Sequence, residues 1–297
     1  MKNKKSNLLV IVPVTRLYGK ELNLRNWILK VSSPEISVLL VHDLQDSITS
    51  NVLRKIILEA SNPRIQMIEG TYNSPGLARN EGIGFLESEW MWFVDADDLP
   101  QIDEGLAIIE KADPDTEVLI GDYSINFSKS SSKQPTMTHL HSLESVAMNP
   151  GMWRMIFRSN SIGQTKFTNH KMGEDQLFLL RFGIFQRRVK FFNTPIYDYF
   201  KNVDGQLTSR RDNIVEIMGV ISETFIIFEK ASGGTKKLIG IMLVRQLITF
   251  LKNSSFGETI RVLRKTPNKI SILRMKNILI FIYSLILVCR YKLECND

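Results

Sequence analysis

The stretch from residue 90 to residue 98 most constrains how this chain can fold. It reads Trp-Met-Trp-Phe-Val-Asp-Ala-Asp-Asp, an apolar run that ends in three carboxylates within four positions. The run is typical of a buried strand. Because alternate side chains of a strand share a face, Asp95 and Asp97 can point the same way, with Asp98 beside them on the turn.

Two interpretations of these carboxylates are open. Clustered carboxylates at the end of a strand repel one another unless a positive charge joins them, and a magnesium or manganese ion carrying a diphosphate would do so. The alternative is a polar turn in which Asp97 or Asp98 caps a following helix. The flanking sequence is needed to choose between them.

The flanking segments predict an α/β fold. Residues 73–82 indicate a Gly/Pro loop that opens a short helix, on which Arg79 could face a phosphate. Residues 8–15 predict a strand followed by a loop, and residues 36–41 a second strand that ends at His42 and Asp43. Strands and helices alternate to about residue 122, as a mostly parallel sheet requires.

Together these segments resemble glycosyltransferase family 2. The resemblance lies in four motifs. The first strand ends in Pro-Val, here Pro13-Val14, and the second ends in an acid, here Asp43. Ala-Arg-Asn-x-Gly is found at residues 78–82 and Phe-Val-Asp-x-Asp-Asp at residues 93–98. It continues through Gly173-Glu174-Asp175 and covers about residues 6–211. It implies the GT-A nucleotide-binding fold with a mostly parallel central sheet. The expected domains are a catalytic domain over residues 1–211 and a basic, helical C-terminal extension over residues 212–297.

The resemblance also implies roles for the acidic pair Glu174 and Asp175. In similar inverting enzymes the Asp is the general base that takes the proton of the acceptor hydroxyl, which it must approach to about 3 Å. Glu174 would then orient Asp175 or hold the acceptor. Without the resemblance, the pair would be interpreted as acids favoured in a first helical turn by the helix dipole.

A donor site follows from the same comparison. Asp97, with Asp95, would hold the divalent metal, Mn or Mg, and Arg79 would stabilise charge near the diphosphate. The implied donor-binding residues are Pro13, Thr15, Asp43, Arg79, Asp95 and Asp97. The family's usual Tyr-Asn after Pro-Val is Thr15-Arg16 here, and residues 44–47 replace its Gly-Ser-Thr-Asp turn. Uridine is the common base among similar proteins, and these departures leave the base open.

The expected function is transfer of a single sugar from a nucleotide-diphosphate sugar, with UDP favoured, to a hydroxyl of a glycan or lipid-linked acceptor in bacterial surface polysaccharide assembly. Two other functions remain as alternatives. One is an inactive glycan-binding or scaffold protein on a GT-A fold. The other is a sugar nucleotidyltransferase, which normally shows a Gly-rich, Lys/Arg-bearing signature after the first strand that residues 13–19 lack.

The basic charge is concentrated in the tail. Residues 230–297 hold thirteen Lys or Arg and three acids, whereas residues 1–229 hold 25 basic and 28 acidic residues. No nucleic-acid partner is expected, because the basic residues accompany an apolar run rather than an aromatic-interleaved groove motif. That run, residues 278–289, is too short to cross a bilayer. It either attaches to the cytoplasmic face of the plasma membrane as a peripheral segment or packs as a buried helix.

The remaining features are weaker. Three lysines before the run at residues 8–14 mimic a signal peptide, but a first strand is expected there. Cys289 and Cys295 are too few for a disulfide framework and fit a reducing compartment. His139 and His141 could share a strand face, yet no ligand cluster accompanies them to make a zinc site. Tyr197 and Tyr199 could stack on a sugar ring or simply fill the core.

Overall fold

The computed structural model describes residues 7–17, 20–44, 47–85, 87–127, 135–139, 141–201, 214–254, 280 and 283–288. The chain divides into two compact units. The first contains residues 1–141, 151–169 and 187–206, and the second contains residues 142–150, 170–186 and 207–297. The predicted catalytic domain over residues 1–211 therefore contributes segments to both units.

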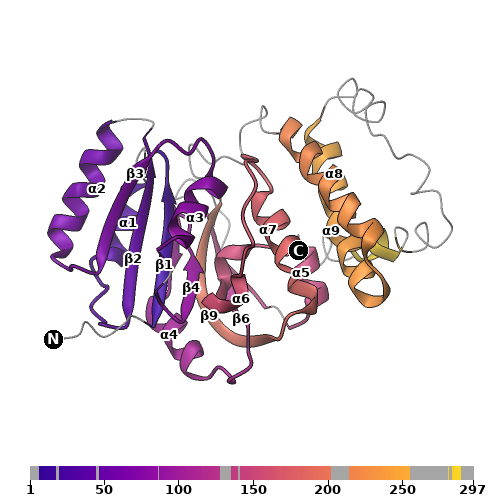
Figure 1. Cartoon of the computed structure of the whole chain (residues 1–297), viewed down its shortest axis with the longest axis horizontal. Coiled ribbons are helices and arrows are strands. Elements are labelled where there is room, and N and C mark those ends of the chain that lie inside the picture. Colours follow the sequence, from indigo (N-terminus) through magenta and orange to yellow (C-terminus); the bar gives the residue numbers. More distant parts are fainter. Residues whose placement is uncertain are drawn as a thin grey trace. The chain divides into compact units, whose positions relative to one another are not determined.

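One sheet forms the centre of the first unit (Figure 1). Its described strands, nine in number, are β1 (Leu8–Val14), β2 (Ile36–Asp43), β3 (Ile65–Gly70), β4 (Trp90–Phe93), β5 (Leu99–Pro100), β6 (Val118–Phe127), β7 (Thr136–Thr138), β8 (Met155–Arg158) and β9 (Val189–Lys201). Their order is β3-β2-β1-β4-β8-β6-β9-β5, and β7 pairs with β6. The strands β1 to β4 are parallel, as are β6 and β9, whereas β5, β7 and β8 run antiparallel to their neighbours. The mostly parallel α/β sheet expected from the sequence is confirmed.

The strand β1 owes its central place to a continuous apolar sequence. Leu8 is in register with Ile36 of β2 on one side and with Trp90 of β4 on the other. Five of its seven side chains, from Leu8 to Val12, are buried in a row. A strand covered on both faces needs such a run rather than an alternating pattern. The first strand predicted at residues 8–14 is thus confirmed.

The longer helices of the first unit are α1 (Glu21–Ile28), α2 (Ser47–Ala60), α3 (Pro75–Ile83) and α4 (Ile102–Glu110), and two short turns are η1 (Met152–Arg154) and α6 (Ser159–Ile162). The helix α3 crosses in front of the strands in Figure 1 and packs on β1 and β2. Gly82 allows this close approach, because a Cβ atom there would lie 2.5 Å from Cγ2 of Ile11. The helix begins where the sequence predicts, with Ser74 as its N-cap and Pro75 in its first turn.

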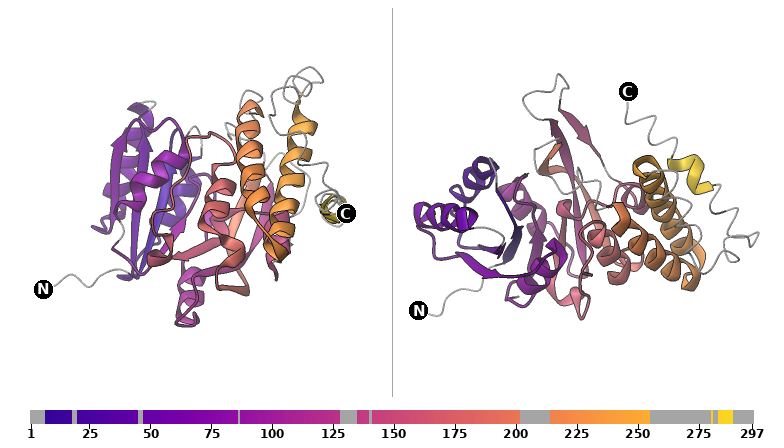
Figure 2. Two further views of the ribbon diagram at one scale, coloured as in Figure 1. Left: turned by 45° about the vertical axis from the view of Figure 1, so that its right-hand side comes forward. Right: turned by 90° about the horizontal axis from the view of Figure 1, so that it is seen from above.

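The described part of the second unit is helical. It contains α5 (Leu143–Met148), α7 (Glu174–Phe182), η2 (Ile184–Gln186), α8 (Ile214–Lys230) and α9 (Gly233–Asn253). The helices α8 and α9 lie side by side in both views of Figure 2, joined by a two-residue connection, and α5 packs on α9. Two helices joined so closely form an antiparallel hairpin. The helical C-terminal extension expected from the sequence is confirmed over α8 and α9.

The C-terminal segment is described only at residues 280 and 283–288. Ile280 and Ser284 approach Gly240 of α9, where a Cβ atom would lie 2.7 Å from Cγ2 of Ile280. Residues 278, 279, 281, 282 and 289 of the apolar run, together with both cysteines, lie outside the described residues. No helix within the described ranges has both the length and the hydropathy that crossing a membrane requires.

Candidate active site

Three carboxylates follow β4 and occupy three different environments. The backbone N–H of Asp98 donates to the carbonyl of Asp95 at 3.2 Å, which closes a tight turn. The side chain of Asp95 is 33% exposed and that of Asp97 is 18% exposed, whereas Asp98 is buried. The turn therefore leaves two carboxylates partly exposed and buries the third.

Asp95 is held by Arg79. The Nη2 atom of Arg79 donates to Oδ1 of Asp95 at 2.8 Å, and the arginine side chain is only 7% exposed. The guanidinium lies over the ring of Phe167 at 5.5 Å, and the side chain of Asn80 exchanges two hydrogen bonds with the backbone of Phe167. The helix α3 thus supplies a fixed positive charge to the acidic turn. The contact with a phosphate that was expected of Arg79 stays a prediction.

Asp97 is held by the segment that precedes α1. Nζ of Lys20 lies 3.1 Å from Oδ2 of Asp97, and the lysine side chain is 10% exposed. Nδ2 of Asn23 donates to the backbone carbonyl of the same aspartate at 2.9 Å. Neither residue was predicted from the sequence. No motif marks them, since a single lysine after a loop and an asparagine in a helix are ordinary surface residues by sequence alone.

Asp98 has a structural role. Its Oδ2 accepts a hydrogen bond from the hydroxyl of Tyr197 at 2.9 Å, and its Oδ1 accepts from the backbone N–H of Phe200 at 2.8 Å. Burial raises the pKa of Asp98 well above its ordinary value, and the charges of Asp97 and Asp95 raise it further. The capping interpretation is wrong for this turn, because the next helix, α4, begins after Gln101.

Tyr197 connects this buried acid to the exposed part of the turn. Its hydroxyl donates to Asp98 and accepts from the backbone N–H of Asp95 at 3.1 Å. The side chain is fully buried, so it fills the core and binds the acidic turn rather than stacking on a sugar. Tyr199, two residues along β9, is partly exposed and stacks on Trp153 with the ring centroids 5.1 Å apart.

The donor atoms of this turn fit a hard divalent cation. Magnesium and manganese prefer carboxylate oxygens, and such sites commonly use one or two carboxylates together with the phosphates of a substrate. Asp95 and Asp97 offer that pair. Among the residues that the structure describes, no group of three or more His, Cys, Asp or Glu side chains could hold a metal by itself. A metal held by these two carboxylates would have further coordination positions for water or for the phosphates of a substrate.

The residues expected to line the nucleoside pocket lie at the same edge of the sheet as the acidic turn. Pro13 and Thr15 are at the carboxyl end of β1, and Asp43 ends the parallel neighbour β2. Thr15 is exposed and Pro13 is half-buried. Ligands of open α/β sheets bind at the carboxyl ends of the strands, the edge to which the acidic turn after β4 also belongs.

Asp43 shapes the loop that leads into α3. Its two carboxylate oxygens accept hydrogen bonds from the backbone N–H groups of Tyr72 at 2.8 Å and Asn73 at 3.0 Å. Asn73 has a φ of +60° and so turns the chain toward the N-cap Ser74. Asp43 thereby places the helix that carries Arg79, in addition to any contact with a base or ribose.

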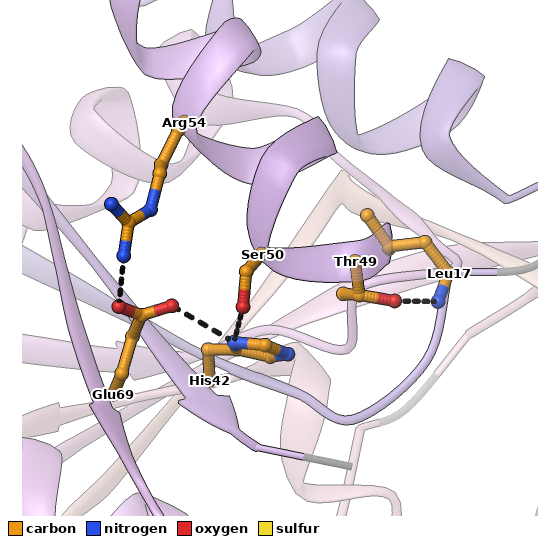
Figure 3. A network of polar contacts seen from close by, with 6 residues as sticks. All are labelled: Leu17, His42, Thr49, Ser50, Arg54 and Glu69. Carbon is orange, nitrogen blue, oxygen red and sulfur yellow. Dashed lines mark hydrogen bonds and ion pairs between the residues drawn. The ribbon is translucent and has the colours of Figure 1, made fainter. Parts of the chain in front are cut away.

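A polar network supports this edge from the face of α2 (Figure 3). Nδ1 of the buried His42 lies 3.2 Å from Oγ of Ser50 and 3.4 Å from Oε1 of Glu69, and Arg54 donates to the same glutamate at 2.6 Å. The contact with Glu69 favours the tautomer with the hydrogen on Nδ1, because a carboxylate only accepts. The hydrogen bond from the hydroxyl of Ser50 is the largest cause that lowers the pKa of Glu69. Arg54 and His42 lower this pKa further, whereas burial raises it.

Glu174 and Asp175 form the first turn of α7 in the second unit. The helix begins after Gly173, whose φ of +80° only glycine adopts without strain, and it ends at Gly183 in the same conformation. Glu174 is buried, whereas Asp175 is half-buried and its Oδ1 accepts from the backbone N–H of Gln176 at 2.8 Å. The predicted position of the pair at a helix start is confirmed.

Comparison with known proteins gives one curated relative and several solved structures. Over 152 residues the chain is 24% identical to "Putative glycosyltransferase EpsH" of Bacillus subtilis (strain 168), a match that covers 46% of this chain and 44% of that protein. The chain therefore spans less than half the length of this curated relative. The match alone does not establish the activity of the whole protein.

The solved structures confirm the GT-A fold. S. aureus TarS 1-349 in complex with UDP matches with a TM-score of 0.66 at 17% identity, over 94% of this chain and 86% of that one. The same protein in complex with UDP-GlcNAc gives 0.63 at 18% identity, over 94% and 79%. The mannosyltransferase PcManGT from Pyrobaculum calidifontis, in complex with GDP-Man and Mn²⁺, gives 0.56 at 12% identity, over 99% and 89%. The sequence model of glycosyl transferase family 2 matches residues 10–189, which is more than half of the chain, and this protein accordingly belongs to that family.

Proposed function

We propose that this protein transfers a single sugar from a nucleotide-diphosphate sugar to a hydroxyl of a glycan or lipid-linked acceptor, and that it inverts the anomeric configuration. The observation that carries the proposal is the acidic turn after β4, where Asp95 lies beside the buried Arg79 and Asp97 beside Lys20. Positive charges at this edge, with a divalent metal held by the two carboxylates, would suit a diphosphate that gains negative charge as the sugar leaves. UDP is the favoured nucleotide, in line with the UDP and UDP-GlcNAc complexes of the S. aureus neighbour.

In the proposed reaction Asp175 accepts the proton of the acceptor hydroxyl. The hydroxyl oxygen forms a bond to the anomeric carbon from the face opposite the diphosphate, while the bond from that carbon to the diphosphate oxygen breaks. Glu174 orients Asp175 or holds the acceptor, and Arg79 stabilises the charge on the leaving diphosphate. A divalent metal bound at Asp97 and Asp95 would act as a Lewis acid toward the diphosphate. Pro13, Thr15 and Asp43 would line the nucleoside pocket.

The donor part of the proposal is tested by thermal unfolding. A ligand that binds only the folded state raises the melting temperature, so UDP, UDP-GlcNAc, GDP and GDP-Man are compared with and without manganese. We expect one nucleotide to stabilise the wild type in the presence of manganese and Asp97→Ala to abolish that stabilisation. Asp115→Ala, which removes an exposed carboxylate of the same unit, is the control. No response of the wild type to any nucleotide would instead support the inactive-scaffold alternative.

We also propose peripheral attachment to an anionic membrane surface through the C-terminal extension. Tyr283, Leu285 and Ile286 are exposed on the described part of the apolar segment, and residues 230–297 are strongly basic. Apolar side chains beside lysines and arginines suit insertion beneath anionic headgroups. Sedimentation with anionic vesicles should recover the wild type but not Leu285→Asp. Equal recovery of the wild type with neutral vesicles would contradict the proposed attraction of the basic extension to anionic headgroups.

A further inference from the structure

Lys20 contacts Asp97, one of the two carboxylates proposed to hold the metal. Its ammonium is 3.1 Å from Oδ2 of Asp97, and both side chains are largely shielded from solvent. The contact does not stand alone, because Asn23 binds the backbone carbonyl of Asp97 from the first turn of α1. The segment that enters α1 therefore positions the acidic residue and supplies it with a counter-charge.

A divalent cation and the ammonium cannot both bind this carboxylate closely. Two positive charges a few ångströms apart repel, and the repulsion is stronger where solvent is largely excluded. Lys20 must therefore oppose the binding of a bare metal ion at Asp97. An incoming diphosphate changes this balance, because it offers negative oxygens that the ammonium can bind instead.

The lysine side chain is suited to such an exchange. It is a compact point charge on a flexible four-carbon stem, and its three donors can turn from a carboxylate to a phosphate. Arg79 cannot turn from its carboxylate to a phosphate in this way, since its guanidinium is held between Asp95 and the ring of Phe167. The acidic turn thus has one fixed cation and one that can move.

We propose that Lys20 is a donor-binding residue that neutralises Asp97 in the free protein and passes to the diphosphate when the donor binds. Metal and nucleotide then enter the site together, because the nucleotide removes the charge that keeps the metal out. This inference rests on the proposed function, since it assumes a diphosphate donor and a divalent metal at Asp97.

The test uses Lys20→Met, which removes the charge and keeps much of the side-chain length. Manganese binding to the nucleotide-free protein is measured by electron paramagnetic resonance, and UDP binding without metal by calorimetry. We expect manganese to bind about tenfold more tightly to the variant and UDP about tenfold more weakly. A merely structural role of Lys20 would weaken both. Lys20→Arg keeps the charge and should resemble the wild type for UDP, and Lys30→Met, at an exposed lysine after α1, is the control.

The outcomes separate this inference from the proposed function. Two results would overturn the role of Lys20 while leaving the donor site intact. In the first, Lys20→Met binds manganese and UDP as tightly as the wild type does. In the second, its affinities for both ligands fall together. A wild type that binds neither UDP nor manganese would overturn both. If Lys20→Met fails to unfold cooperatively, Lys20→Gln replaces it. The coupling between the two ligands is then decisive: UDP should tighten manganese binding more in the wild type than in the variant.

Discussion

The guanidinium of Arg79 donates to the carboxylate of Asp95 at 2.8 Å across the edge of the sheet where β1, β2 and β4 end. The arginine is buried between this carboxylate and Phe167, whereas the aspartate is one-third exposed. The arginine of the pair is therefore enclosed by the fold, and the partly exposed side chain of Asp95 is the part of the pair that solvent reaches.

Arg79→Met should destabilise the fold and weaken donor binding. The substitution leaves Asp95 beside Asp97 without its nearest cation, and removing one member of a partly buried pair costs about 2 kcal/mol of unfolding free energy. Urea denaturation measures this loss, and calorimetry with UDP and manganese measures the affinity. Arg25→Met, which breaks an exposed pair with Glu59, should cost less than about 1 kcal/mol. Equal losses in the two variants would contradict the role given to Arg79.

Tyr197→Phe should loosen the acidic turn. The substitution removes one hydroxyl that satisfies both the carboxylate of Asp98 and the N–H of Asp95 inside the fold. Each buried polar group left without its partner costs about 1–3 kcal/mol, so we expect a loss of about 2–3 kcal/mol. Tyr199→Phe, at the next position on the same strand face, should cost less than about 0.5 kcal/mol. Chemical denaturation of both variants decides between a hydrogen-bonding and a packing role.

The sequence predicted the parts of the site that depend on strand and helix patterns. The apolar run before Asp95 has the composition of a buried strand, and parallel strands bring their carboxyl ends to one edge, so Asp43 and Asp95 were placed correctly on the sheet. The start of the helix that carries Arg79 was likewise predicted, because Ser74 and Pro75 mark it. These signals act over a few residues and are therefore visible in the sequence.

The remaining parts depend on contacts between distant residues. Asp98 meets Tyr197, 99 positions away, and Asp97 meets Lys20, 77 positions away. No local pattern distinguishes a tyrosine that binds a buried acid from one that fills the core, or this lysine from a solvated one. The same holds for Asp43, whose bonds to the backbone of Tyr72 and Asn73 require the loop geometry to be known.

Glu69→Gln should destabilise the protein in a pH-dependent way. The folded pKa of Glu69 lies below its ordinary value of 4.5, so the unfolded chain binds more protons as the pH falls through this range. The stabilisation is therefore complete above about pH 4.5 and disappears as the pH drops through the folded pKa. At pH 7 the variant should lose less than about 1 kcal/mol, because Glu69 and Arg54 face solvent.

Stability of wild type and Glu69→Gln is compared by denaturation from pH 7 to pH 3. The two curves should converge at the acidic end, and Glu87→Gln, at an exposed glutamate before β4, is the control. A constant difference between wild type and Glu69→Gln at every pH would show that the carboxylate charge is not what His42, Ser50 and Arg54 stabilise.

Asp175→Asn should abolish sugar transfer while leaving donor binding intact. The amide oxygen of the variant can still accept the hydrogen bond from the N–H of Gln176, so the first turn of α7 is preserved. A general base contributes about 10²–10⁴-fold to the rate, and a loss of that size in kcat is expected at saturating donor. The UDP-induced rise in melting temperature should equal that of the wild type, in contrast to Asp97→Ala. Glu174→Gln should lower kcat less, because it acts through Asp175 or the acceptor. Full activity of Asp175→Asn would assign the proton transfer to another residue.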